Sequence, residues 1–346
     1  MTDKKIFAGI LIVILIIAVA GILIMSSGAG GTEKTTFLPQ TTTRVIQDND
    51  NRTVTIPVQP ARIIVTVPWM LSITSAIQGR DLVVGITTET TKDYGFNQLF
   101  PSWINSKPAV GSFNELNTES VLKVNPDLVI SQTGKAVTQM EGMDVPVVVV
   151  SRMPEIPENI RFIGSVIGRT AQAEALATYY ERKVDLARSR TAGIDPDQQK
   201  TVYYIAGTVV TKTAGKDFGN YPLVRYAGGR LVTEELKGGS GTEISIEQLM
   251  EWNPDVIVVA YGWGLTPEDV LDDPRLQDIT AVKNRAVYLE PPPHAACLKK
   301  HPSSCLGVLW LAQKMYPDLF TDVDIQKESQ DFVQNFYGVK WDATFE

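Results

Sequence analysis

The chain of 346 residues has little cysteine and little histidine, with two of each. Two cysteines exclude a small scaffold held together by many disulfides, and two histidines exclude a site built from several imidazoles. No Gly-x-Ser-x-Gly, His-Glu-x-x-His or phosphate-loop motif is present, so we expect a binding protein without an intrinsic cofactor rather than an enzyme. A formal net charge of −7 and the lack of a strongly basic stretch argue against a nucleic-acid partner. The 44% hydrophobic and 21% charged content is that of a globular protein.

The first 25 residues predict a membrane anchor. Lys4 and Lys5 precede an uncharged run over residues 6–25, and 20 helical residues span about 30 Å, the thickness of a bilayer core. Most cleavable signals have a shorter apolar region, so we expect a retained transmembrane helix over 1–25, with cleavage and secretion as the alternative. Both place the rest of the chain outside the cytoplasm, at the outer face of the membrane. Residues 26–43 are rich in Gly, Ser and Thr, which predicts a flexible linker.

The remainder predicts an α/β fold with two lobes. Short apolar runs alternate with helical segments, a pattern typical of mostly parallel sheets. We place an N-terminal lobe at 44–155 and a C-terminal lobe at 195–346. Between them, residues 156–194 predict connecting helices: a short one and then a long one over about 171–192, with Thr170 as its N-cap. A helix of that length can join two lobes as a stiff strut.

An internal repeat supports two related lobes. Residues 119–130 match residues 247–258 at an offset of 128 positions. In each copy a polar N-cap, Asn117 or Ser245, precedes a short helix, Asn-Pro-Asp ends it, and an apolar strand follows. Two copies of one helix–turn–strand unit indicate related halves.

In their order and spacing, these features resemble the periplasmic-binding-protein family that serves ABC importers of iron chelates, haem and cobalamin. The resemblance covers about residues 44–340 and rests on a predicted hairpin at 45–57, the segments 60–65, 79–86 and 110–111, the two Asn-Pro-Asp units, and the segments 226–229, 281–288 and 306–312. It implies two Rossmann-like lobes joined by one long helix, ligand held between them, and delivery to an ABC permease with its ATPase. It also implies that Glu119 and Glu247 dock onto permease arginines. The alternative is local, because a carboxylate in the first turn of a helix is favoured by the helix dipole.

Ligands of open α/β lobes lie in loops beyond the carboxyl ends of the strands. Three aromatic residues in such loops could stack on a flat organic ligand: Trp69, Tyr94 and Trp263. Three basic residues could pair with an anionic chelate: Arg152, Lys212 and Arg225. For each of them, ordinary core or surface packing is the alternative.

Both histidines and both cysteines fall within twelve residues, at His294, Cys297, His301 and Cys305. A Cys297–Cys305 disulfide would suit an extracellular compartment. Metal ligation by His294, His301 and Cys297, or a histidine on a haem or corrinoid centre, is the second interpretation, and unpaired structural roles are the third. Ser303 is predicted to cap a helix through residue 311, which would separate Cys305 from the loop.

The leading hypothesis is an extracytoplasmic substrate-binding component that captures a metal-containing ligand (a ferric siderophore, haem or a corrinoid such as cobalamin). The alternative is the same fold binding a molybdate-type oxyanion or a transition-metal ion. An extracellular metalloenzyme using His294, His301 and Glu290 is expected less, and so is an adhesive or structural role. Asn51-Arg52-Thr53 also forms an N-glycosylation sequon at Asn51.

Overall fold

The fold is described from a computed structural model, which covers residues 42–345 except 93, 151–155 and 219–220. The predicted anchor at 1–25 and nearly all of the predicted linker at 26–43 lie outside the described residues. Among the helices that are described, none is long and apolar enough to cross a membrane.

The N-terminal lobe starts with a hairpin and continues as a parallel sheet. β1 (Thr43–Gln47) and β2 (Thr53–Pro57) pair antiparallel, which confirms the predicted hairpin. The sheet has the order β4–β3–β5–β6, and all its pairs are parallel. Its strands are almost wholly buried, as expected for a parallel sheet covered on both faces: β3 (Ile63–Val65), β4 (Val83–Ile86), β5 (Leu128–Ser131) and β6 (Val147–Val149).

Short helices connect these strands. They are α1 (Pro68–Ala76), η1 (Arg80–Leu82), α2 (Thr88–Thr91), α3 (Tyr94–Leu99), α4 (Pro101–Asn105), α5 (Thr118–Lys123) and α6 (Lys135–Gln139).

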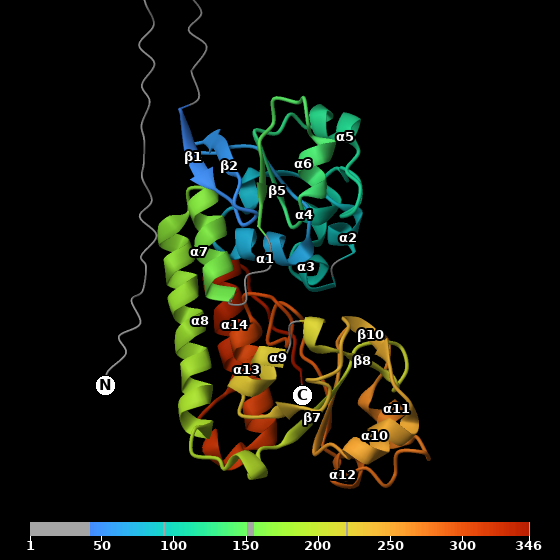
Figure 1. The fold of residues 1–346 in the computed structure, drawn as a ribbon. Coiled ribbons are helices and arrows are strands. Elements are labelled where there is room, and N and C mark those ends of the chain that lie inside the picture. Colours follow the sequence, from blue (N-terminus) through green and yellow to red (C-terminus); the bar gives the residue numbers. More distant parts are fainter. Residues whose placement is uncertain (1–41, 93, 151–155, 219–220, 346) are drawn as a thin grey trace, which may run out of the picture.

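Two packed helices join the lobes. α7 (Ile156–Val166) is followed by α8 (Thr170–Thr191), which runs alongside both lobes (Figure 1). Its 22 residues span about 33 Å. A Cβ atom at Gly164 would lie 2.2 Å from Cβ of Ala173, so the close approach of the two helices requires glycine there. The predicted pair of connecting helices is therefore confirmed. The N-cap of α8, however, is Arg169 rather than the predicted Thr170, and no side chain caps this helix.

The C-terminal lobe has a six-stranded mixed sheet in the order β10–β8–β7–β11–β12, with β9 also beside β7. β7, β9, β11 and β12 are parallel, whereas β8 and β10 add an antiparallel edge that the apolar pattern did not indicate. The strands are β7 (Thr201–Ile205), β8 (Lys212–Ala214), β9 (Arg230–Leu231), β10 (Ser240–Glu243), β11 (Val256–Val259) and β12 (Val287–Leu289). The helices are η2 (Pro196–Gln198), η3 (Lys216–Phe218), α9 (Tyr221–Tyr226), α10 (Ile246–Trp252), α11 (Pro267–Leu271), α12 (Thr280–Lys283), α13 (Ser304–Met315), η4 (Pro317–Leu319), α14 (Ile325–Phe332) and the π-helical η5 (Val333–Tyr337).

The internal repeat appears in both lobes as helix, turn and strand. Side chains of Asn117 and Ser245 cap α5 and α10, as predicted. Each Asn-Pro-Asp turn then serves a neighbouring strand. The Asp127 carboxylate accepts the amides of Ala61 and Arg62 just before β3. The Asp255 carboxylate accepts the amide of Thr201 at the start of β7, so both aspartates hold the beginning of a strand.

The C-terminal segment contacts both lobes. Its Tyr337 packs edge-on against Phe100 of the N-terminal lobe, with ring centroids 6.2 Å apart. Trp341 packs edge-on against His294 of the C-terminal lobe, at 4.9 Å. One hydrophobic cluster contains residues from both lobes and from the strut. The lobes are therefore connected by more than α8, and the end of the chain does not belong to the C-terminal lobe alone, contrary to what its sequence pattern had indicated.

Candidate ligand-binding site

The site lies where the carboxyl edges of the two sheets face each other. On the N-terminal side, α1 begins directly after β3, and no side chain caps its N-terminus. Trp69, in its first turn, is 8% exposed and donates from Nε1 to Oε1 of Gln132, 2.7 Å away, at the end of β5. The Thr87 hydroxyl, after β4, donates to the Thr66 carbonyl at 2.9 Å. This edge therefore presents an ordered indole and buried hydroxyl groups.

Two contacts bridge the lobes at this edge. Gln98 in α3 donates from Nε2 to the Tyr261 hydroxyl, 2.8 Å away, after β11. Gly95, also in α3, lies against the loop after β12: a Cβ atom there would be 3.2 Å from Pro293 Cβ and 3.3 Å from His294 Nδ1. Glycine at this position allows the lobes to approach closely.

The C-terminal side is organised around the fully buried carboxylate of Glu290, which follows β12. Its Oε2 accepts the Tyr204 hydroxyl at 2.9 Å and the Tyr261 amide at 3.1 Å, and its Oε1 accepts the Leu298 amide at 2.6 Å. Lys299 Nζ lies 3.3 Å from Oε2 and donates to the Tyr261 carbonyl at 3.1 Å. Burial and the nearby Glu290 charge raise the pKa of Tyr204, which keeps that hydroxyl protonated as a donor. Glu290 thus fixes both the Tyr261 loop and the 290–302 loop that face the N-terminal lobe.

His294 is 4% exposed, and neither ring nitrogen has a hydrogen-bond partner in the described structure. Burial, together with the charge of His301, lowers the pKa of His294 to about 4. The imidazole is therefore neutral at physiological pH, with one donor and one acceptor nitrogen at the lobe boundary.

A small cavity lies between the lobes in the described part of the chain. This cavity of about 10 Å³ is lined by Trp69, Ile73, Ile156, Asn159 and Lys300, so it joins α1 and α7 to the 290–302 loop. A volume of this size holds about one water molecule.

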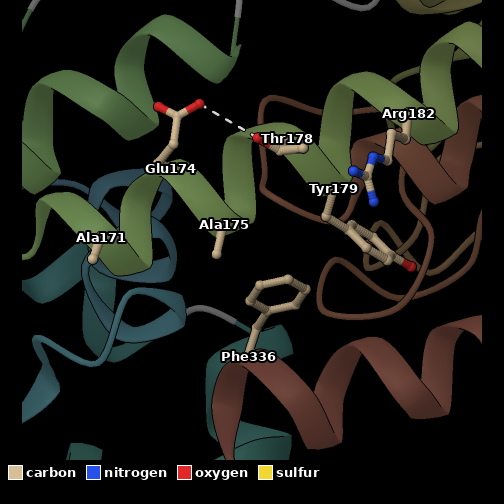
Figure 2. A pocket seen from close by; sticks show the side chains of 7 residues that line it. All are labelled: Ala171, Glu174, Ala175, Thr178, Tyr179, Arg182 and Phe336. Carbon is tan, nitrogen blue, oxygen red and sulfur yellow. Dashed lines mark hydrogen bonds between the residues drawn. The ribbon is translucent and has the colours of Figure 1, made fainter.

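A larger groove lies away from the lobe edge, beside the strut. This groove, of about 600 Å³, lies between α8 and η5. Figure 2 shows the side chains that line it, among them the rings of Tyr179 and Phe336, and the hydrogen bond between Thr178 and Glu174. Of the predicted ligand-binding residues whose side chains are described, none lines it.

The predicted disulfide is absent, since both cysteines are buried free thiols. Cys297 Sγ lies 3.6 Å from the Pro293 carbonyl, whereas Cys305 lies in the first turn of α13, with Sγ 3.6 Å from the Pro302 carbonyl. Ser303 precedes α13 as predicted, but its hydroxyl donates to the Pro293 carbonyl instead of capping the helix. The two thiols therefore contact different backbone carbonyls and not each other.

The predicted metal set is also not assembled. In the described part of the chain, no three His, Cys, Asp or Glu side chains are placed to hold an ion, so His294, Cys297 and His301 form no such group. Burial raises the pKa of Cys297 to about 12, so this thiol is protonated at physiological pH.

The other predicted ligand residues are dispersed. Trp263 is 41% exposed in the loop after β11. Lys212 in β8 has Nζ 3.7 Å from Glu243. Arg225 in α9 lines a groove beside the C-terminal half of α8, with Arg188, and this groove shares no residue with the cavity at Trp69. Tyr94 begins α3, but its side chain is not described, and Arg152 lies outside the described residues.

Tyr261 and Lys299 lie in loops beyond the carboxyl ends of strands, where ligand contacts were predicted, although neither residue was singled out. Gln98 was not predicted to belong to the site. The importance of Glu290 could have been recognised from the sequence, because an acidic residue directly after a buried strand is unusual. Gln98 had no such signal, since its partner is 163 positions away.

Comparison with known proteins gives consistent matches. Residues 69–293 match the sequence model of a family described as periplasmic binding protein. The chain is 28% identical over 325 residues to the molybdate-binding protein MolA of Haemophilus influenzae, covering 85% of this chain and 91% of MolA. It is 26% identical over 300 residues to YvrC of Bacillus subtilis, an uncharacterized ABC transporter substrate-binding lipoprotein, covering 84% and 90%.

Solved structures agree with the fold. The structure of MolA bound to molybdate superimposes with a TM-score of 0.77 at 26% identity, covering 86% of this chain and 99% of MolA. The Helicobacter pylori CeuE structure with bound Ni(II) gives a TM-score of 0.71 at 22% identity, covering 86% and 96%, and supports the fold alone.

Proposed function

Because this chain belongs to the periplasmic binding protein family, and is thus the extracytoplasmic substrate-binding component of an ABC importer rather than an enzyme, we propose that it captures a molybdate-type oxyanion between its two lobes. This choice reverses the order of ligand classes that the sequence favoured.

The observation that carries the proposal is the close approach of the lobes. Gln98 and Tyr261 hydrogen-bond across the boundary, and the cavity beside Trp69 is about 10 Å³. Organic ligands generally need pockets of about 300–1,000 Å³. A tetrahedral oxyanion needs only a small separation of the lobes and a few converging donors.

The donors at this edge suit an anion. The uncapped N-terminus of α1 carries partial positive charge, and an anion is favoured there. Lys300 lines the same cavity from the opposite lobe and adds a full positive charge. The similarity to MolA, a molybdate-binding protein, supports the same ligand class.

A metal chelate is the second candidate, and Trp263 favours it. An indole that is 41% exposed in a loop at the ligand edge can cover a flat ligand such as haem or a corrinoid. This ligand requires the Gln98–Tyr261 hydrogen bond to break and the lobes to open widely.

The partner in both cases is the ABC permease with its ATPase. We propose that Glu119 and Glu247 dock onto it, since each is exposed in the first turn of its repeat helix, α5 or α10. The Glu119→Lys/Glu247→Lys variant should abolish uptake and leave ligand affinity unchanged. Anchoring by residues 1–25 and glycosylation at Asn51 stay predictions.

Calorimetric titration with molybdate, tungstate and sulfate, and separately with a ferric siderophore, haem and cobalamin, tests the ligand class. We expect saturable binding of molybdate and tungstate, lost in Trp69→Ala and retained in Trp263→Ala. Binding of one chelate alone, lost in Trp263→Ala, would transfer the function to the second candidate. Sulfate, a smaller tetrahedral anion, is the control for size.

A further inference from the structure

We propose that Leu122 and Met250 are a matched pair of apolar anchors through which the two lobes contact the permease. This inference rests on the proposed function, because it assigns the permease as partner. It adds an apolar component to the surface that Glu119 and Glu247 provide.

The two anchors occupy equivalent positions on the surface. Leu122 is 51% exposed in α5 and Met250 is 42% exposed in α10, and they are 128 positions apart, the offset of the repeat. Each residue from 118 to 127 is buried, intermediate or exposed in the same way as its counterpart from 246 to 255. The two lobes therefore present the same local surface.

Other surface residues that are identical in the two copies of the repeat have a local structural reason, whereas Leu122 and Met250 have none. Asn125 and Asn253 have positive φ values, 45° and 43°, which asparagine tolerates better than most residues. Glu119 and Glu247 lie in a first helical turn, where a carboxylate is favoured.

The neighbouring exposed position has changed its chemistry, from Lys123 to Glu251. The solvent-facing position thus tolerates substitution within this unit. No local feature of the helix favours a large apolar side chain at an exposed position. Both copies of the repeat nevertheless have one there.

Single exposed apolar residues are ordinary on soluble proteins, so exposure alone would mean little. Leu319, for example, is 41% exposed at the end of η4, and the position 128 residues earlier is Thr191 in α8. Leu122 and Met250 differ from it because each has a counterpart and each lies three residues after an exposed glutamate, on the same face of its helix.

The placement fits one partner that spans both lobes. α5 and α10 both lie on the side of the molecule away from α8 (Figure 1). A permease with two related halves could offer each lobe a basic group for the glutamate and an apolar pocket for the anchor. Charge complementarity would set the register, and the apolar contact would slow dissociation.

Photo-crosslinking of the full chain in its host cells tests the proposal. A photoreactive amino acid at position 123 or 251, beside each anchor, should cross-link to a polytopic ABC permease. Leu122→Ser/Met250→Ser should lower this yield on the order of tenfold, whereas Leu319→Ser should leave it unchanged. Purified variants should keep the wild-type melting temperature and ligand titration.

The outcomes separate the anchors from the function. If Glu119→Lys/Glu247→Lys lowers cross-linking and Leu122→Ser/Met250→Ser does not, the apolar anchors are wrong and the carboxylate docking stands. If the wild type gives no permease cross-link from either position, this docking surface is wrong altogether, and the ligand titrations judge the binding function independently.

Discussion

His294 shows how burial changes the chemistry of a single residue. Its pKa is lowered from the ordinary 6.5 to about 4 because the ring is buried at the lobe boundary. The unfolded chain therefore binds a proton on this ring near pH 6.5, while the folded protein does so only near pH 4. The contribution of neutral His294 to stability is complete above pH 6.5 and is lost as the pH falls toward 4.

We expect His294→Phe to remove this pH dependence. Between pH 7 and pH 4, the wild type should lose up to about 3 kcal/mol more unfolding free energy than the variant. Urea unfolding at pH 7 and at pH 4.5 measures the difference. Trp341→Phe alters the same ring contact without removing the imidazole, so it should keep the wild-type pH dependence. A parallel decline in wild type and His294→Phe would contradict the assignment.

Glu290 is expected to be the most sensitive residue of the ligand edge. Glu290→Gln replaces one acceptor oxygen by a donor, leaves at least one buried donor unpaired, and removes the charge that faces Lys299. We expect a loss of about 3 kcal/mol of unfolding free energy in urea titrations. Glu243→Gln, at an exposed carboxylate 3.7 Å from Lys212, should cost less than about 0.5 kcal/mol. Equal losses in the two variants would argue against the Glu290 network.

At the scale of elements, the Asn-Pro-Asp turns were predictable because their signals are local. The polar cap, the proline and the apolar strand lie within one stretch of chain, and the structure forms them in both lobes. The role of the aspartates was not predictable, because Asp127 binds amides more than 60 positions away. The edge strands β8 and β10 were missed because their residues form no apolar run.

Asp127→Ala and Asp255→Ala should each remove a carboxylate that holds the start of a strand. We expect each to cost about 2 kcal/mol, since charge-assisted hydrogen bonds to backbone amides are lost. The double variant should show the sum, because the two aspartates belong to different lobes and share no partner. Urea unfolding of the single and double variants measures this. A double variant no less stable than either single one would disprove independent roles.

Gly95 permits the contact between α3 and the loop after β12. In Gly95→Leu the new side chain must displace Pro293 or His294, so the lobes should separate and bind ligand at least about tenfold more weakly. Small-angle scattering should show a larger radius of gyration. Gly193→Leu is the matched control, because no atom lies within 4 Å of a Cβ atom there. Unchanged size and affinity in Gly95→Leu would show that the contact is not needed.

At the scale of the whole molecule, the lobes form one structure with limited freedom. α8, the shared hydrophobic cluster and the C-terminal segment all connect them. Closure on a ligand should therefore be a small movement at the carboxyl edges of the sheets.

The two-lobed architecture followed from patterns along the chain, whereas the site did not. Loop position identified Trp69 and His294 at the lobe boundary. Arg225, which was predicted for its positive charge, lies instead beside α8. The Gln98–Tyr261 bridge depends on how complete lobes pack, and no local pattern encodes that contact.

The most direct test is anomalous diffraction at the molybdenum absorption edge, from crystals of the protein grown with saturating molybdate. The account predicts one strong peak between the N-terminus of α1 and the 290–302 loop, next to Trp69 and Lys300. A peak only in the groove at Arg188 and Arg225, or no peak between the lobes, would contradict it.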